Sequence, residues 1–415
     1  MFDGVVIGGG AAGMFAAIQA AKRGQKVLLL EKNQRLGKKL LITGKGRCNV
    51  TNHCTAAEVM QNIPKNGRFL YSALDQFGPL DVIEFFEKHD CALKTERGNR
   101  VFPTSDLSSS VLGALKSALH KHGVQIRTAA AESIVTENGT VKSVMADGEP
   151  ILCKWVILAT GGLSYPATGS TGDGYRIASS LGHTVTPCEG SLVPLETDGS
   201  DAQDMQGLSL RNVGVKLVNE KGKVIFKDFG ELLFTHFGVS GPTVLSASAH
   251  LKGKCRLLID LKPALEEDKL HDRILRDLDT YKNRSMENAL TDLLPRSMIP
   301  IVLRRIGVEG SLQGNSFTKE NRRALVQELK AFSLDIIGKR PVQEAIITSG
   351  GIKVSEIDPK TMGSKLVNGL YFAGEIIDCD AYTGGFNLQI AWSTAYAAAT
   401  AVADRYLQIP MRENH

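Results

Sequence analysis

The chain has 415 residues, 43% of them hydrophobic, so it is long enough for two or three domains with their own cores. Its net charge of +5 is spread over interleaved acids and bases with no long basic run, and the sequence therefore does not predict a nucleic-acid partner. The seven cysteines include no CxxC pair, which argues against a metal site or a redox dithiol and fits reduced cytosolic thiols.

The N-terminal residues predict a βαβ unit. Residues 5–7 form a short apolar strand, a glycine-rich loop follows, and an alanine-rich helix runs from about residue 11 to 23. Gly24 ends that helix, and residues 26–30 show the continuous apolar pattern of a buried parallel strand. With neither a signal sequence nor an apolar run long enough to cross a bilayer, we expect a cytoplasmic protein without a membrane partner.

The loop inside this unit carries the first chemical signal. Residues 8–13 read Gly-Gly-Gly-Ala-Ala-Gly and fit the pattern GxGxxG, which permits a tight turn and close approach of the backbone to a diphosphate. The following helix N-terminus offers free N–H groups to that anion. Glu31 closes the second strand, where an acid binds ribose hydroxyls. A glycine turn alone is weak evidence, but strand, loop, helix and acid together predict a dinucleotide site.

Between this unit and residue 190 the chain is mixed. Residues 33–55 form a basic loop with several glycines, and residues 68–122 look mostly helical. Further strands are expected over residues 123–127, 133–145 and 155–159. A turn at residues 137–139 is expected to divide the second of these ranges into two strands.

From residue 190 the pattern changes. Short β-branched runs separated by turns predict a small antiparallel barrel or sandwich. These runs cover residues 192–196, 208–213, 215–218, 224–227 and 232–235. Residues 265–332 read as helices, and the remaining expected elements are strands at 344–348 and 370–374 and a long helix at 384–406.

These patterns divide the chain into a split dinucleotide-binding domain and an insertion. The discontinuous domain is expected over residues 1–189 and 345–415, the β-barrel over 190–264 and 333–344, and a helical subdomain over 265–332. Only one GxGxxG is present, so we expect one tightly bound dinucleotide. The C-terminal pattern favours FAD: the glycines at 384 and 385 open a helix whose N-terminus would stabilise negative charge on a reduced flavin. The competing interpretation is a structural, glycine-capped helix.

Four stretches carry a resemblance to a known family: GKKLLITGKGRCN at residues 37–49, GGLSYP at 161–166, LLFTHFGVSGP at 232–242 and YFAGE at 371–375. On these motifs the chain resembles, over essentially its whole length, the bacterial NAD(P)/FAD-dependent oxidoreductases labelled aminoacetone oxidases or bile-acid enone reductases. The resemblance implies an α/β fold: a glutathione-reductase-type FAD-binding Rossmann domain with an inserted antiparallel β-barrel and a small helical subdomain.

The resemblance also implies FAD contacts beyond the glycine loop. Ala131 stands where the family usually has a valine, but the contact there is through the backbone and survives the change. Taken with the fingerprint, the expected cofactor-binding residues are Gly8, Gly10, Ala11, Ala12, Gly13, Glu31, Lys32, Lys39, Thr43, Gly44, Arg47, Cys48, Asn49, Ala131, Ala159, Thr160, Gly161, Gly374, Glu375, Asp378, Gly385, Phe386, Asn387 and Leu388.

Three residues are candidates for catalysis, each with a plainer alternative. Arg47 could balance an anionic flavin or bind an acidic substrate, or it could simply pair with acids at the surface. Cys48 falls in the flavin-lining loop but has no CxxC partner, which favours packing. His236 could exchange a proton beside the flavin, or it could be a structural histidine satisfied by the backbone.

The sequence therefore predicts a FAD-dependent oxidoreductase that passes electrons between NAD(P)H and a small organic substrate. With no separate nicotinamide-binding domain, NAD(P)H is expected to dock only transiently. The oxidative alternative is an amine oxidase that uses dioxygen. The alternative from another functional class is a flavin-binding factor that modifies RNA or senses redox state.

Overall fold

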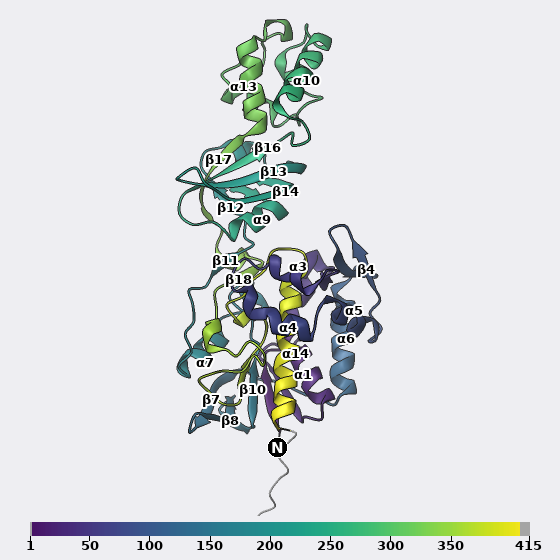
Figure 1. Cartoon of the computed structure of the whole chain (residues 1–415), viewed down its shortest axis with the longest axis vertical. Helices are drawn as coiled ribbons and strands as arrows, with labels where there is room; N and C mark the ends of the chain where they lie inside the picture. The colour runs from purple at the N-terminus through teal and green to yellow at the C-terminus, as the bar shows by residue number, and fades with distance from the viewer. Residues whose placement is uncertain (1, 407–415) are drawn as a thin grey trace, which may run out of the picture. The chain divides into compact units, whose positions relative to one another are not determined.

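The computed structural model describes residues 2–406, which form two compact units (Figure 1). Unit 2 is the inserted segment Leu192–Pro341, and unit 1 is formed by the described residues on either side of it. Among these residues, no helix has both the length and the apolarity that crossing a membrane requires.

Unit 1 is built on a five-stranded parallel sheet in the order β19-β10-β1-β2-β6. The strands β1 and β10 at its centre are fully buried, as expected when both faces of a parallel sheet are covered. Because the strands are parallel, the loops that follow them gather at one edge of the sheet. The strands are β1 (Gly4–Ile7), β2 (Val27–Glu31), β6 (Gln125–Thr128), β10 (Trp155–Leu158) and β19 (Leu370–Phe372).

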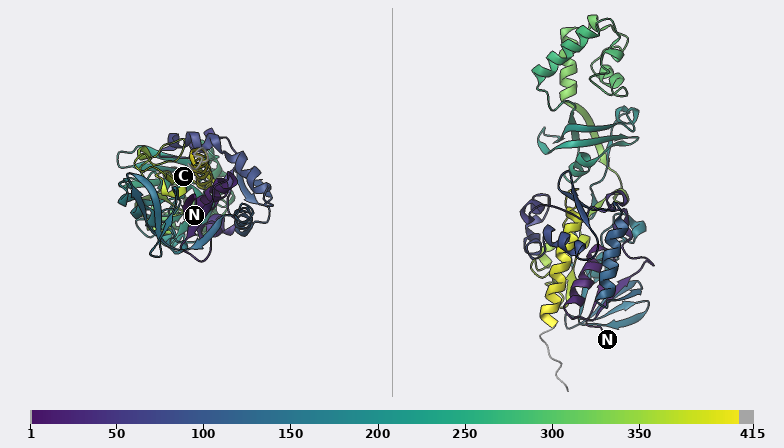
Figure 2. Two further views of the ribbon diagram at one scale, coloured as in Figure 1. Left: turned by 90° about the horizontal axis from the view of Figure 1, so that it is seen from below. Right: turned by 90° about the vertical axis from the view of Figure 1, so that its right-hand side faces the viewer.

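Two helices from opposite ends of the sequence lie side by side in this unit (Figures 1 and 2). They are α1 (Ala11–Lys22) and α14 (Phe386–Tyr406), and α14 is buried nearly all round. Their many alanines allow close approach, and Phe15 of α1 meets Trp392 of α14 with ring centroids 5.5 Å apart. Both helix N-termini are thereby held near the same edge of the sheet.

The prediction that residues 68–122 are mostly helical is wrong over its middle. Helices α4 (Tyr71–Gln76), α5 (Pro79–Glu87) and α6 (Ser108–Lys121) are present, but β4 (Leu93–Glu96) and β5 (Arg100–Pro103) form an antiparallel hairpin between them. The three-residue connecting turn, residues 97–99, has positive φ angles at Gly98 and Asn99, and loops of this length commonly join hairpins. The signal for this turn was in the sequence and was outweighed by the helical pattern on either side.

The remaining elements of unit 1 are small. Two three-stranded antiparallel sheets, one of which contains β4 and β5, and a two-stranded pair extend the unit beyond the main sheet. The strand expected at residues 344–348 lies slightly later. The elements are α2 (Lys38–Ile42), β3 (Thr51–Asn52), α3 (Ala56–Gln61), β7 (Ala131–Glu137), β8 (Thr140–Ala146), β9 (Glu149–Leu152), α7 (Asp173–Ser180), β11 (Glu189–Ser191) and β18 (Ile347–Ser349).

Unit 2 contains a closed six-stranded antiparallel barrel in the order β12-β15-β14-β13-β16-β17, which decides between the barrel and the sandwich. Runs that looked separate in the sequence join into two long strands, β13 and β14. The strand β16 was not anticipated from the sequence. The strands are β12 (Leu195–Thr197), β13 (Ser209–Asn219), β14 (Val224–Thr235), β15 (Gly238–Ser240), β16 (Cys255–Asp260) and β17 (Phe332–Lys339).

Helices complete unit 2. The longest, α10 and α13, have buried aliphatic residues spaced three or four apart and polar outer faces, so each helix packs against the unit through one face. The helices are α8 (Asp201–Asp204), α9 (Pro242–Ser248), α10 (Glu267–Thr280), α11 (Met286–Ala289), α12 (Ile299–Arg305) and α13 (Lys319–Lys330).

Candidate functional site

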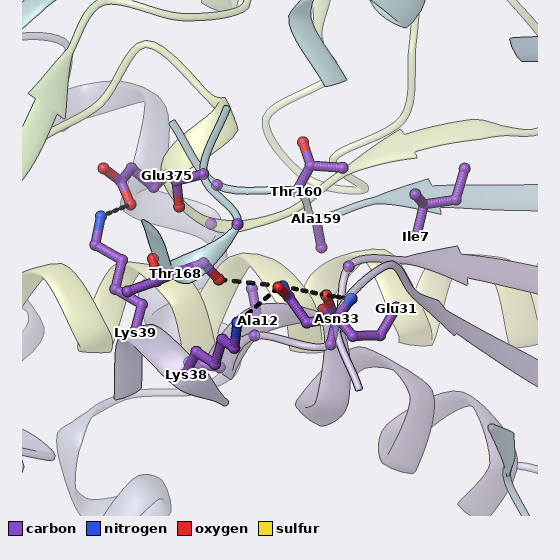
Figure 3. Close-up of a pocket in the computed structure, with 18 of the residues that line it drawn as sticks. Ile7, Ala12, Glu31, Asn33, Lys38, Lys39, Ala159, Thr160, Thr168 and Glu375 are labelled. Carbon is purple, nitrogen blue, oxygen red and sulfur yellow. Dashed lines mark hydrogen bonds and ion pairs between the residues drawn. The ribbon is translucent and has the colours of Figure 1, made fainter. Parts of the chain in front are cut away.

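A cavity of about 320 Å³ lies in unit 1 where the ends of the parallel strands meet (Figure 3). The glycine loop after β1, the end of β2 and the loop after β10 line it, together with the end of β19 and the first turn of α14. Both ends of the chain therefore contribute to one site, at the edge where open α/β sheets bind their ligands.

The glycines of this loop serve two different purposes. A Cβ atom on Gly13 would lie 1.8 Å from the carbonyl oxygen of Gly8, and one on Gly8 would lie 2.4 Å from that of Ala159, so no side chain fits at either position. A Cβ on Gly10 would meet nothing within 4 Å, and Gly10 lines the cavity. Gly8 and Gly13 therefore serve packing of the chain, whereas Gly10 keeps the cavity open.

The N-terminus of α1 at this loop has unused hydrogen-bonding capacity. Gly10 is the N-cap residue, no side chain caps the helix, and its first turn contains no acid. The first N–H groups of a helix have no partner within the helix, and they lie at the positive end of its dipole. This end of the cavity is therefore suited to an anion such as a diphosphate.

Glu31 stands at the end of β2 and holds the loop in place (Figure 3). One carboxylate oxygen accepts a hydrogen bond from the backbone N–H of Gly9 at 2.7 Å. The other accepts from the backbone N–H of Asn33 at 2.8 Å and from its side-chain amide at 2.7 Å. A carboxylate has about four acceptor positions, so Glu31 can hold the loop and still accept from ligand hydroxyls.

A second polar cluster ties together segments distant in sequence. Lys39 on α2 forms an ion pair with Glu375 at 2.6 Å (Figure 3). The same carboxylate accepts hydrogen bonds from the Ser164 hydroxyl and from the Thr348 backbone N–H, both at 2.9 Å. These three contacts let Glu375 hold the loops around the cavity together, and, like Glu31, it keeps about one acceptor position.

The structure brings most of the expected cofactor-binding residues to this one cavity. Those that line it are Gly8, Gly10, Ala11, Ala12, Glu31, Lys32, Lys39, Thr43, Ala131, Ala159, Thr160, Gly161, Gly374, Glu375, Asn387 and Leu388. Those that do not are Gly13, Gly44, Arg47, Cys48, Asn49, Asp378, Gly385 and Phe386.

Two of the residues outside the cavity have clear structural reasons to be there. A Cβ atom on Gly385 would lie 2.4 Å from the carbonyl oxygen of Thr51, so this glycine allows two backbone segments to touch. Asp378 is only 3% exposed and pairs with Lys65 at 2.8 Å. Asp378 therefore lies outside this cavity, and its approach to the cofactor stays a prediction.

Arg47 is engaged by acids of the chain itself. Its guanidinium donates hydrogen bonds to Glu96 and Asp106 and lies over the ring of Phe102, 4.2 Å from the ring centroid. The hydrogen bonds to Glu96 and Asp106 raise the pKa of Arg47 further, so its charge is permanent. These contacts favour surface pairing, the plainer of the two interpretations, over a role at the flavin.

Cys48 is a buried thiol with no exposed surface. Burial raises its pKa to about 12. Because the thiolate is the reactive form of cysteine, these observations favour packing over redox chemistry.

We expect Cys48 to resist alkylation in the native protein. With a pKa of about 12, roughly one thiol in ten thousand is ionised near pH 8, and burial also denies the reagent access. Mass spectrometry after brief treatment with iodoacetamide should find Cys48 unmodified in the native protein and modified after unfolding in urea. Native labelling as fast as that of the unfolded chain would show a reactive Cys48.

His236, the candidate for proton transfer, belongs to unit 2. It is exposed and lies in the turn between β14 and β15, with its ring centroid 4.9 Å from that of Phe237. Its role beside a flavin stays a prediction.

Two buried polar atoms of the expected cofactor-binding residues lack a hydrogen-bond partner in the part of the chain that the structure describes, and only one of them belongs to a residue of the cavity wall. The hydroxyl of Thr160, on the cavity wall, and the amide oxygen of Asn49 have no hydrogen-bond partner within residues 2–406. Buried polar atoms of native proteins normally have a partner, so each unpaired atom calls for an explanation. The uncapped helix and the open space at Gly10 fit an elongated ligand with phosphates and hydroxyls, as a dinucleotide is.

Several residues of the site were missed by sequence reasoning. Asn33 binds Glu31 and accepts from Lys38 at 2.9 Å, and its closeness to Glu31 in sequence was the available signal. Ser164 and Thr348 join the cluster around Glu375 only through the tertiary fold, and no local motif marks them.

Comparisons with known proteins agree with this geometry. The family described as the HI0933-like protein Rossmann domain matches residues 2–401. The 3-dehydro-bile acid delta(4,6)-reductase of Clostridium scindens is 31% identical over 408 residues, which are 96% of this chain and 98% of that protein. The ribosomal RNA dihydrouridine synthase of Escherichia coli is 31% identical over 398 residues, 96% of this chain and 97% of that protein.

Among solved structures, the 3-ketosteroid delta1-dehydrogenase of Sterolibacterium denitrificans is similar in fold. It matches with a TM-score of 0.52 and 14% identity, over 97% of this chain and 99% of that one. At this identity the likeness concerns the arrangement of the chain and nothing more.

Proposed function

The chain belongs to the HI0933-like Rossmann family, and on this premise we propose that it is a FAD-dependent oxidoreductase that reduces a carbon–carbon double bond conjugated to a carbonyl group, with NAD(P)H as the electron donor. The observation that carries the proposal is the cavity of unit 1, where the uncapped N-terminus of α1, the open space at Gly10 and the carboxylate of Glu31 lie together.

Different residues of the cavity would bind different parts of FAD. The N–H groups at the start of α1 would bind the diphosphate, and Glu31 would accept hydrogen bonds from ribose hydroxyls. The first turn of α14, at Asn387 and Leu388, lines the same cavity and contains no acid. Its positive dipole end would stabilise negative charge that develops on the cofactor.

The redox chemistry belongs to the cofactor and the orientation to the protein. The chemistry that bound FAD would supply is the transfer of two electrons from NAD(P)H, which becomes NAD(P)⁺, to the β carbon of the conjugated double bond, with one proton added at the α carbon.

The names of two relatives support the proposed reaction. A 3-dehydro-bile acid carries a ketone, and the C. scindens protein is named as a reductase of delta(4,6) double bonds. The E. coli protein is named for making dihydrouridine in ribosomal RNA, a reduction of the double bond in uracil that is conjugated to a ring carbonyl. The two names share one reaction type, although the substrates differ greatly in size.

The substrate has two candidates. The first is a small enone, following the bile-acid reductase. The second is a uracil base in RNA, favoured by the relatives of E. coli and Haemophilus influenzae, both named ribosomal RNA dihydrouridine synthases and matching 96% and 97% of this chain.

Anaerobic mixing tests the electron donor and the direction. We expect NADH or NADPH to bleach the visible band of the bound flavin under argon, and a conjugated enone or uridine-containing RNA to restore it. Bleaching by a small amine but by neither nicotinamide would contradict the proposal and indicate amine oxidation with dioxygen. A protein that binds FAD, but whose flavin is reduced by neither NADH nor NADPH, would also contradict the proposal.

A further inference from the structure

The outer face of the barrel in unit 2 holds an unusual pairing of like charges. Lys216 on β13 lies directly opposite Lys227 on β14 in the antiparallel register. Both side chains are exposed, and neither forms an ion pair within residues 2–406. Like charges directly opposite each other destabilise a sheet, so this pair costs stability unless an anion neutralises it.

More lysines flank this pair at the end of the hairpin. Lys221 and Lys223 are exposed in the turn between β13 and β14, and the side chain of Asn219 accepts hydrogen bonds from both of their backbone N–H groups. Asn219 is in register with Cys255 at the start of β16, which brings the loop before β16 alongside the turn.

That loop adds two further exposed lysines. We define the basic face by its members Lys216, Lys221, Lys223, Lys227, Lys252 and Lys254. None of them forms an ion pair within the described residues. The nearby acids are Glu220 in the turn and Asp228 and Glu231 on β14, while Arg256 and Asp335 offset each other at 3.7 Å. The six lysines outnumber these acids, so the basic face has a net positive charge.

An aromatic ring stands beside these charges. Phe229 on β14 is 55% exposed although it is a large apolar residue. It lies opposite Gly214, which has no side chain to cover the ring. Because alternate residues of a strand share a face, Phe229 and Lys227 point to the same side of β14. An exposed ring next to cations that follow a strand is the arrangement that binds single-stranded nucleic acid, through stacking on bases and contacts to phosphates.

We propose that the basic face binds RNA, with its lysines on the phosphates and Phe229 stacked on a base. The inference rests on the second substrate candidate of the proposed function, the uracil base in RNA, and gives that substrate a docking surface on this chain. An anionic membrane is less well matched, because a single exposed ring provides little apolar surface to insert. The sequence hid this surface, since its lysines are separated by apolar and acidic residues and meet only when β13, β14 and the loop before β16 come together.

Binding of a labelled RNA by the FAD-loaded enzyme tests the proposal. The probe is a fluorescein-labelled single-stranded oligonucleotide rich in uridine, followed by anisotropy at several salt concentrations. We expect the double variant Lys216→Glu/Lys227→Glu to lose at least about tenfold in affinity, and the dependence of log K on log salt to weaken by about 1.4, which is two phosphate contacts. Phe229→Ala should also lose about tenfold, through stacking.

The matched control is Lys319→Glu/Arg323→Glu, an equal charge change on exposed residues of α13 in the same unit. Retained RNA binding in this control, with loss in the two test variants, supports the proposal. Absence of RNA binding by the unaltered enzyme, equal loss in the control, or binding to phosphatidylserine vesicles without binding to RNA would overturn it.

Flavin reduction by NAD(P)H and enone reduction, measured on the same preparations, separate this inference from the proposed function. Normal reduction of the flavin and of the enone, without RNA binding, would contradict only the proposal that the basic face binds RNA. RNA binding with no reduction of any conjugated substrate would contradict the proposed reaction but not the proposal that the basic face binds RNA.

Discussion

The Gly10→Val variant should fold normally and lose at least about 100-fold in FAD affinity, so that it is purified colourless. The backbone at Gly10 has φ −81°, which a side-chain-bearing residue adopts without strain. A Cβ there would meet no protein atom within 4 Å, so the valine would occupy the open cavity at the start of α1. This is the space that the diphosphate would need. Absorbance of the purified variant and quenching of flavin fluorescence on titration give the affinity.

Gly113→Val is the matched control for this variant. Gly113 also has open space around its Cβ position, but it lies on α6 away from the cavity. The control should carry FAD as the unaltered protein does, and both variants should keep the far-ultraviolet circular dichroism of the native fold. A yellow Gly10→Val protein with unchanged FAD affinity would contradict the assignment of the diphosphate to this helix start.

The second large effect is expected at Glu31. Glu31→Ala removes the acceptor for Gly9 and for both N–H groups of Asn33, and also the group proposed for the ribose hydroxyls. Hydrogen bonds to a charged group contribute about 1.5–3 kcal/mol each, so FAD affinity should fall by roughly 100-fold or more. Glu31→Gln keeps one acceptor oxygen and should be intermediate. Isothermal titration of the FAD-free proteins measures all three affinities.

Glu137→Ala provides the comparison for Glu31. Glu137 is an exposed acid that pairs with Lys142 at 2.8 Å on a surface hairpin, and its removal should leave FAD affinity unchanged. If Glu31→Ala binds FAD as well as this control does, the carboxylate serves only the loop and the ribose contact must be assigned elsewhere.

The local parts of the fold were readable from the sequence. The βαβ unit depends on neighbouring residues alone: an apolar strand, a glycine loop and an alanine-rich helix. The hairpin β4–β5 was missed because its Gly98-Asn99 turn is short and lies between two helical segments. Gly253 marks a turn before strand β16, but residues 255–260 gain their place by pairing with β13 and β17, which are distant in sequence.

The site was predictable where a motif fixes the backbone and less so where it leaves the side chain free. The glycine loop and Glu31 fell where their spacing indicated. Arg47 and Cys48 lie in a stretch that carries the family resemblance, but the direction of each side chain depends on distant partners, as Asp106 shows for Arg47. The pair of Lys39 and Glu375 lies 336 residues apart in sequence, and no local pattern links them.

The central claim is that the cavity of unit 1 holds one FAD through the start of α1 and Glu31. The most direct measurement is the visible spectrum of the natively purified protein, followed by heat release of the cofactor and its identification by mass. The account predicts a flavin band and close to one FAD per chain. A colourless protein that does not take up added FAD, or one that releases a different nucleotide, would contradict it.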